Sequence, residues 1–148
     1  MGNWEHRHRV IPAIFLIFRE NSKVLLLKRK GTGYMDGSYS MPAGHVDGNE
    51  PAILAACREA REEVGIDVAP EDLQLVHTKH EMAEGHERIN LGFEVKQYKG
   101  KPKNMEPNKC EELLWAPIDQ LPANTVPQVI EILARVAQGE AYSHHNFI

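Results

Sequence analysis

Three glutamates, Glu59, Glu62 and Glu63, lie three and four residues apart in a segment rich in helix-forming residues. An α-helix turns by about 100° per residue, so this spacing places the three carboxylates on one face. Like charges at this spacing cost about 0.2–0.5 kcal/mol per pair, and near a helix C-terminus they also oppose the helix dipole. A divalent cation would offset this cost, and carboxylate oxygens suit Mg²⁺, Mn²⁺ or Ca²⁺. The pattern indicates a candidate metal site.

The same glutamates could instead form an ordinary charged surface. Arg58 and Glu62 are four residues apart, so they can pair along a helix that faces solvent. The apolar residues of the segment lie beside the acidic face and form a side suited to a core: Ile53, Ala56, Cys57, Ala60 and Val64. Helical periodicity alone leaves both interpretations open.

The residues around the glutamates make the metal site the stronger interpretation. Gly44 is followed after five residues by Glu50, and after seven more by Arg58-Glu59-Ala60-Arg61-Glu62-Glu63, with Gly65-Ile66 closing the pattern. This arrangement over Gly44–Ile66 resembles the Nudix box, with only Ala60 small for its aliphatic position. The chain resembles the Nudix hydrolase family, in particular its MutT-like members, over nearly its whole length.

The resemblance implies an α/β/α sandwich with a mixed sheet between helices. It also implies hydrolysis of a phosphoanhydride bond in a nucleoside diphosphate-linked substrate, with Mg²⁺ as cofactor and Mn²⁺ as a substitute. In this family pattern Glu59 and Glu63 are the main metal ligands. Glu62 is a further ligand or acts through metal-bound water, and Gly44 offers its backbone carbonyl. Arg58 occupies a position that orients the glutamates and their loop.

The identity of the catalytic base stays open, between a glutamate of the box and an acid on a later loop. Glu106 is the preferred outside acid, although it could be an ordinary loop carboxylate. Five other side chains are candidates for contacting the substrate, and each aromatic one could equally be a core residue: Tyr34, Tyr39, His45, Phe93 and Trp115.

The box leaves the rest of the substrate undefined. The resemblance favours a nucleoside triphosphate pyrophosphohydrolase of the MutT type, with an ADP-ribose or nucleotide-sugar pyrophosphatase as the alternative. A non-catalytic nucleotide-binding sensor module is the alternative from another class. RNA-directed hydrolysis is disfavoured because 17 Lys and Arg against 21 Asp and Glu give a net charge of −4, without the basic excess of a long nucleic-acid footprint.

The elements that must position these residues can be predicted from hydrophobic periodicity and turn residues. The sequence predicts strands at 11–19, 24–28, 38–42, 73–82, 88–98 and 112–117, and helices at 50–64 and 126–138. Loops are expected at 31–37, 43–49, 83–87 and 100–108. Strands and helices do not alternate, so the predicted class is α+β with a mixed sheet.

Length and composition set the frame for these elements. A chain of 148 residues fits one domain over 1–148, with 1–9 expected to be flexible or loosely attached and 140–148 a polar C-terminal tail. No apolar run reaches the ~18–20 residues of a membrane span, and no signal-peptide pattern follows the basic N-terminus. Two unrelated cysteines suit a reducing compartment. We therefore expect a cytoplasmic protein acting on a small nucleotide, with a homodimer as one possible assembly.

Overall fold

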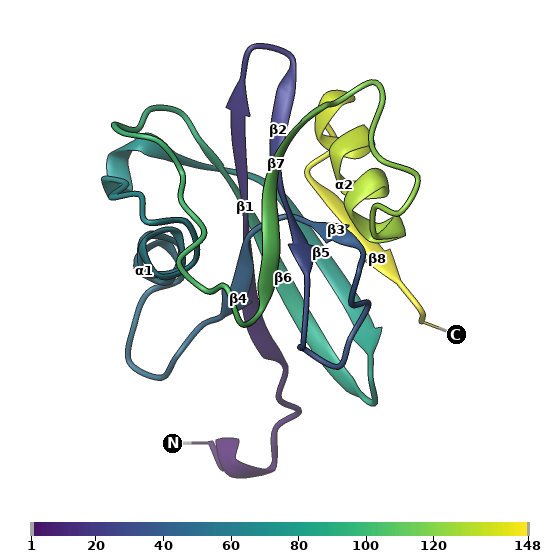
Figure 1. Ribbon diagram of the computed structural model, residues 1–148. Helices are drawn as coiled ribbons and strands as arrows, with labels where there is room; N and C mark the ends of the chain where they lie inside the picture. The colour runs from purple at the N-terminus through teal and green to yellow at the C-terminus, as the bar shows by residue number, and fades with distance from the viewer. Residues whose placement is uncertain (1, 148) are drawn as a thin grey trace.

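Eight strands and two α-helices make up the fold in the computed structural model, which describes residues 2–147 (Figure 1). The strands are β1 (Ile11–Glu20), β2 (Lys23–Arg29), β3 (Tyr39–Ser40), β4 (Ala43–His45), β5 (Leu73–Ala83), β6 (His86–Val95), β7 (Cys110–Pro117) and β8 (Tyr142–His145). The helices are α1 (Ala52–Val64) and α2 (Pro127–Ala137), and two short 3-10 turns, η1 and η2, cover Trp4–His6 and Pro70–Asp72.

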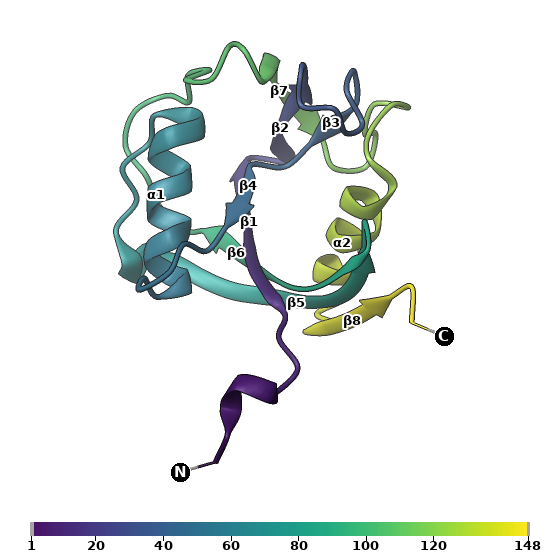
Figure 2. The same ribbon diagram turned by 90° about the horizontal axis from the view of Figure 1, so that it is seen from below.

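The strands form one mixed sheet in the order β3-β2-β1-β6-β5-β8, with β4 also paired to β1 and β7 to β2. The pairs β1–β6 and β5–β8 are parallel, and the other pairs are antiparallel. The two helices lie on opposite sides of the strands (Figure 2). The predicted α+β class and mixed sheet between helices are confirmed.

Alternation along β1 explains why the sheet needs a helix on each face. Ile14, Leu16 and Phe18 pack in the core beneath α1, whereas Phe15 and Ile17 pack in the core beneath α2. Successive side chains of a strand point to opposite faces, so a continuous apolar run indicates a strand buried on both sides. The apolar run of β1 therefore requires two covering layers.

Most predicted elements are present, with shifted boundaries. The expected helix over 50–64 begins at Ala52, because Pro51 has extended backbone and stands at the N-cap. The expected loop over 83–87 shrinks to the turn at Glu84-Gly85, where both residues have positive φ, as a tight hairpin requires.

Two strands lie where the sequence predicted none. The expected loop over 43–49 contains β4, which pairs with β1 through Ala13 and His45. The expected polar tail over 140–148 contains β8, which pairs in parallel with β5. Both strands are too short to show a hydrophobic period, and tertiary pairing defines them.

The N-terminal segment extends away from the sheet and carries η1 (Figures 1 and 2). Its His8 contacts Glu87 on β6.

Within residues 2–147, no helix is both long enough and apolar enough to cross a membrane. Both cysteines, Cys57 and Cys110, are buried and unpaired.

Candidate active site

The acidic face of α1 points at β4, because the opposite side of the helix is held in the core. Ala56, Ala60 and Val64 are fully buried beneath the sheet. Gly65 ends the helix in the left-handed conformation at φ 68°, and its N–H donates to the Ala60 and Arg61 carbonyls. Burial of one side and a defined C-terminus fix the rotation of the helix, and therefore the direction of its glutamates.

Glu59 lies directly against the backbone of Gly44. A Cβ atom at position 44 would lie 2.1 Å from Glu59 Oε1 and 2.2 Å from its carboxyl carbon. Glu59 is only 8% exposed. The glycine is therefore required for close approach of the helix carboxylate to the β4 main chain, which brings the predicted partners Gly44 and Glu59 together.

Glu63 is the second glutamate directed at β4. Its Oε2 atom accepts a hydrogen bond of 3.1 Å from the Ala43 N–H. Burial raises the pKa of Glu63 to about 8, with the charges of Glu59 and Glu106 adding to the increase. Burial also raises the pKa of Glu59, against the lowering effect of Arg58. The helix therefore holds carboxylates in an environment that disfavours their charge.

Arg58 organises the outer side of this cluster. Its Nη1 atom lies 2.9 Å from Glu59 Oε1 and 3.1 Å from Glu62 Oε2, so it joins two of the predicted ligands. Its Nη2 atom donates to Glu50 at 2.7 Å and to the His45 carbonyl at 3.0 Å. The guanidinium therefore ties α1 to the loop that precedes it, which is the contact that the Nudix resemblance implies for this position.

Glu106 comes from a distant loop to the same place. It lines a cavity of about 490 Å³ together with Glu63, Cys110 and Arg29. Its backbone N–H donates to Asn104 Oδ1 at 3.1 Å, and Lys109 Nζ lies 3.5 Å from its carboxylate. The fold thus brings the predicted outside acid beside the box glutamates. We call this space the acidic cavity.

The donor set beside Gly44, next to the acidic cavity, fits a hard divalent cation in kind. Glu59 and Glu63 supply carboxylate oxygens next to the Gly44 main chain, and oxygen donors of this type bind Mg²⁺ and Mn²⁺. Within residues 2–147, no three acidic, histidine or cysteine side chains are grouped closely enough to enclose an ion. Glu59 and Glu62 each pair with Arg58 instead.

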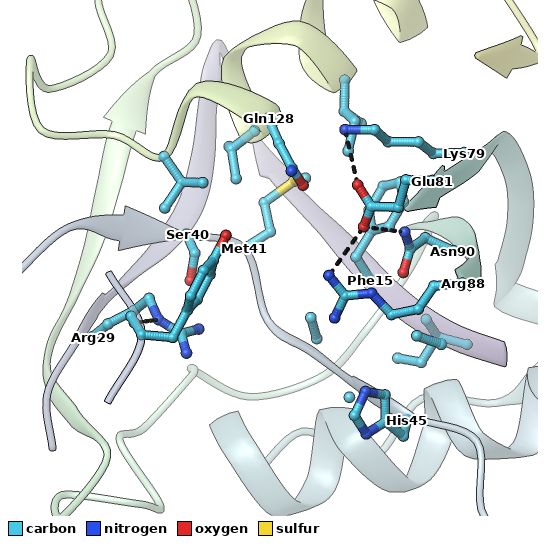
Figure 3. A pocket seen from close by; sticks show the side chains of 18 of the residues that line it. Phe15, Arg29, Ser40, Met41, His45, Lys79, Glu81, Arg88, Asn90 and Gln128 are labelled. Atoms are coloured by element: carbon cyan, nitrogen blue, oxygen red, sulfur yellow. Dashed lines mark hydrogen bonds and ion pairs between the residues drawn. The ribbon is translucent and has the colours of Figure 1, made fainter. Parts of the chain in front are cut away.

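A second cavity of about 350 Å³, drawn in Figure 3, shares lining residues with the first. Arg29, Ala43 and His45 line both cavities. The second cavity lies between the sheet and α2, with Phe15, Met41, Val129 and Ile132 among its apolar walls. We call it the α2 cavity.

The α2 cavity contains polar residues that sequence analysis missed: Lys79, Glu81, Arg88 and Asn90. Lys79 and Glu81 are two positions apart on β5 and therefore point to one face. Charged residues repeating at every second position inside a predicted strand were the available signal. The sequence could not show that this face would be covered by α2.

The predicted substrate contacts separate into two groups. Tyr34 and His45 line the α2 cavity, and the centroid of the Tyr34 ring lies 5.3 Å from the Arg29 guanidinium carbon. The other three do not line either cavity. Tyr39 is buried beneath α2 with its hydroxyl bound to Glu112, and Phe93 is buried beneath α1. Trp115 packs against the α1 core and borders a separate cleft.

Comparison with known proteins identifies the family. A model of the NUDIX domain matches residues 7–136, so the chain belongs to the NUDIX domain family. It is 29% identical over 129 residues to the NAD-capped RNA hydrolase NudC of Stutzerimonas stutzeri strain A1501, covering 85% of this chain and 43% of that protein. The chain therefore spans less than half the length of this relative.

A shorter relative matches along most of both chains. The chain is 27% identical over 124 residues to the 8-oxo-dGTP diphosphatase of Escherichia coli strain K12, covering 81% of this chain and 93% of that protein.

Solved structures show the same fold. The MutT NUDIX hydrolase from Burkholderia pseudomallei aligns with a TM-score of 0.77 at 26% identity, covering 87% of this chain and 99% of its own. The MutT protein from Methanosarcina mazei Go1 aligns with a TM-score of 0.75 at 18% identity, covering 87% of this chain and 94% of its own.

Proposed function

We propose that the chain is a Mg²⁺-dependent hydrolase of phosphoanhydride bonds in nucleoside diphosphate-linked substrates, and specifically a nucleoside triphosphate pyrophosphohydrolase of the MutT type. The observation that carries this proposal is the junction of the two cavities. Glu63 and Glu106 line one cavity, the other has apolar walls from Phe15, Met41, Val129 and Ile132 beside its charged side chains, and Arg29, Ala43 and His45 belong to both. A nucleotide has the matching division, with a flat base at one end and phosphates at the other.

The residues in and beside the acidic cavity have distinct roles in this proposal. Glu59, Glu63 and the Gly44 carbonyl would hold Mg²⁺ or Mn²⁺, with Glu62 as a further ligand once released from Arg58. The ion, when bound, neutralises phosphate charge and lowers the pKa of bound water. The Ala43 N–H fixes the direction of Glu63 through its 3.1 Å hydrogen bond.

Two further groups complete the site. Arg29 has its Nε atom bound to the Tyr34 carbonyl at 2.7 Å, which holds the guanidinium at the junction of the cavities, where it can pair with a phosphate. We propose Glu106, which lines the acidic cavity with Glu63, as the acceptor of the proton from the attacking water, with a glutamate of the box as the alternative. Catalysis of phosphoryl substitution rests largely on positioning and electrostatics, which these contacts provide.

The test is a product screen of the whole chain with and without Mg²⁺. Nucleoside triphosphates, ADP-ribose and nucleotide sugars are offered, and the released pyrophosphate, phosphate and nucleoside monophosphate are measured. We expect pyrophosphate and monophosphate from triphosphates, only with Mg²⁺ or Mn²⁺. Efficient cleavage of ADP-ribose instead would favour the alternative substrate class. Nucleotide binding without any product would favour a sensor module.

Glu63→Gln tests the metal-ligand assignment. We expect turnover to fall by at least about 100-fold, because one charged donor is lost from the site. Folding should be retained, because the pKa of Glu63 is already raised by burial and the amide keeps its shape. Glu71→Gln, which neutralises an exposed carboxylate on η2, is the matched control. A Glu63→Gln variant with normal turnover would contradict the assignment.

The size of the substrate, the location and assembly of the protein, and its domain bounds are also predictions. The net charge of −4 and the limited volume of the two cavities support a small nucleotide rather than a long nucleic acid. A cytoplasmic location and a homodimer are tested by cell fractionation and by light scattering of the purified chain. The single domain over 1–148, with a loosely attached segment at 1–9, is tested by limited proteolysis.

A further inference from the structure

The loop over 30–38, between β2 and β3, contributes residues to both cavities. Thr32 lines the acidic cavity, and Tyr34 lines the α2 cavity. Arg29, the last residue of β2, lines both. The base of the loop is closed by a hydrogen bond of 2.9 Å from the Arg29 N–H to the Ser38 carbonyl. The loop is therefore a local element that can place the arginine between the two cavities.

The loop holds the Arg29 guanidinium at two nitrogen atoms. Nε donates to the Tyr34 carbonyl at 2.7 Å, and Nη2 donates to Thr32 Oγ1 at 3.1 Å. The guanidinium carbon also lies 5.3 Å from the centroid of the Tyr34 ring. These contacts fix the plane of the guanidinium and leave further N–H donors of the group for a ligand.

Asp36 binds the hydroxyl group that Arg29 contacts. Its Oδ1 atom accepts from Thr32 Oγ1 at 2.6 Å and from the Thr32 N–H at 3.1 Å. Its Oδ2 atom accepts from the Gly33 N–H at 3.0 Å. The Thr32 hydroxyl is the main cause that lowers the pKa of Asp36, followed by the two N–H groups. Asp36 lines neither cavity, so it can act on a substrate only through other residues.

The single hydrogen of the Thr32 hydroxyl gives this network a direction. A threonine hydroxyl donates one hydrogen bond and can accept others. The Tyr34 carbonyl lies 3.0 Å from Thr32 Oγ1, but the Asp36 carboxylate is closer and charged, which makes it the stronger acceptor. With its hydrogen directed at Asp36, the oxygen accepts from Arg29 Nη2 and from the Tyr34 N–H. The contacts therefore run from Asp36 through Thr32 to Arg29.

We propose that Asp36 and Thr32 are positioning residues for the phosphate end of the substrate. Asp36 orients the Thr32 hydroxyl, and the hydroxyl holds the Arg29 guanidinium at the junction of the two cavities. This inference rests on the proposed function, because Arg29 pairs with a substrate phosphate there. A long side chain that is held in place before the ligand arrives loses less entropy on binding. Removal of its support should therefore weaken phosphate binding.

The alternative is that Asp36 only stabilises the loop, through its bonds to the Thr32 and Gly33 N–H groups. Thr32→Val separates the two roles, because valine keeps the shape of the side chain but has no hydroxyl. In that variant both backbone N–H groups can still donate to Asp36, whereas Arg29 Nη2 loses its acceptor. Thr32→Ser retains the hydroxyl and is the matched control.

Binding of inorganic pyrophosphate tests the inference without requiring hydrolysis. We would titrate the whole chain with pyrophosphate in the presence of Mg²⁺ and measure affinity by calorimetry. Arg29→Gln, Asp36→Ala and Thr32→Val should each weaken binding by about tenfold. Thr32→Ser should keep the affinity, as should Asp119→Ala, which removes an exposed carboxylate outside both cavities. Unchanged affinity in Thr32→Val, or no binding to the unmodified chain at millimolar pyrophosphate, would overturn the proposal.

A double-mutant cycle shows whether Asp36 acts through Arg29. In the Arg29→Gln background, Asp36→Ala should weaken pyrophosphate binding by much less than tenfold, because the group that it positions is already absent. Two independent tenfold losses would show that Asp36 acts by another route and would contradict the proposal. Urea denaturation checks that each variant is folded. If Asp36→Ala is not, Thr32→Val takes its place in the cycle.

Kinetics with a hydrolysed triphosphate separate this proposal from the proposed function. Asp36→Ala and Thr32→Val should raise KM by about tenfold and leave kcat nearly unchanged, as expected for binding that is equal in the ground state and the transition state. If pyrophosphate binding shows the coupling but no triphosphate is hydrolysed, the positioning role stands and the proposed activity is wrong. If triphosphates are hydrolysed and both variants keep the KM of the unmodified chain, the activity stands and the positioning role is overturned.

Discussion

The acidic cavity and the polar wall of the α2 cavity, formed by Lys79, Glu81, Arg88 and Asn90, both contain charged side chains, but they balance the charges differently. At the acidic cavity, Glu63 and the neighbouring Glu59 carry one sign of charge, and burial raises the pKa of both. In the polar wall, Glu81 lies between two cations, Lys79 and Arg88. The first region gathers its charges from one helix and a loop, the second from two paired strands.

This difference indicates what each region needs from a ligand. Arg58 pairs with Glu59 and Glu62, and Lys109 pairs with Glu106, whereas Glu63 makes no ion pair within residues 2–147. In the polar wall, Lys79 and Arg88 each lie within ion-pair distance of Glu81. The first region therefore suits an added cation, and the charges of the second region balance one another.

After Glu63→Gln, Gly44→Ala should have the largest effect, because it separates the helix carboxylates from β4. The new Cβ would lie 2.1 Å from Glu59 Oε1, so the carboxylate must move. A displacement of this kind near a reacting group costs about 100-fold in rate. Steady-state hydrolysis of the preferred triphosphate measures the loss.

Gly48→Ala is the control for that experiment, since nothing lies within 4 Å of its Cβ position in the loop before α1. Its activity should stay close to that of the unmodified chain. Equal losses in the two variants would show that the close approach of Glu59 to position 44 has no special importance.

Gly92→Ala applies the same steric test to the α2 cavity. Its Cβ would lie 2.2 Å from the Phe15 ring, so the variant should lower the free energy of unfolding by about 1–3 kcal/mol. Urea denaturation measures this change. Phe15→Leu in the same chain makes space and should recover part of the loss, which a double-mutant cycle reveals as coupling. Additive effects would contradict the proposed packing.

The acidic face could be predicted from sequence because its geometry is local. Glu59, Glu62 and Glu63 belong to one helix, and the helical period alone places them together. The Nudix resemblance then indicated Gly44 and Arg58 as partners, and the structure brings both to the glutamates. A pattern confined to a few turns of one helix can be recognised from the sequence without knowledge of the tertiary fold.

The polar wall could not be predicted in the same way. Lys79 and Asn90 become neighbours only through the register of β5 and β6, and the cavity exists only because α2 covers that face. The same limitation affected the aromatic candidates. Phe93 faces the α1 core, and a shift of one position along the strand would have turned it to the other face. Strand register carries information that composition and spacing do not.

Arg58→Lys sharpens the comparison by weakening the cation that pairs with Glu59 and Glu62. Lysine keeps the charge but cannot reach Glu50, Glu59 and Glu62 through a planar group with several donors. We expect about a tenfold loss of activity, as for other groups that orient metal ligands. Titration of activity with Mg²⁺ measures it, and Arg61→Lys, on the exposed side of α1, is the control. Unchanged Mg²⁺ dependence would show that Arg58 does not orient the ligands.

Glu87→Gln should have the smallest effect and provides a surface reference for both regions. Glu87 lies at the start of β6, where its hydrogen bond to His80 and its contact with His8 lower its pKa below the usual range. A carboxylate whose folded-state pKa is lowered stabilises the fold above its ordinary pKa, and this contribution is lost as the pH falls through the lowered value. The unmodified chain should therefore lose more stability than Glu87→Gln between about pH 6 and about pH 3. Urea denaturation at both pH values measures the difference.

Hydrolysis at neutral pH by Glu87→Gln should be unchanged, because Glu87 lines neither cavity. A loss of activity equal to that of Arg58→Lys would mean that the β5–β6 turn is coupled to the acidic cavity, and the separation of the two regions would then be wrong.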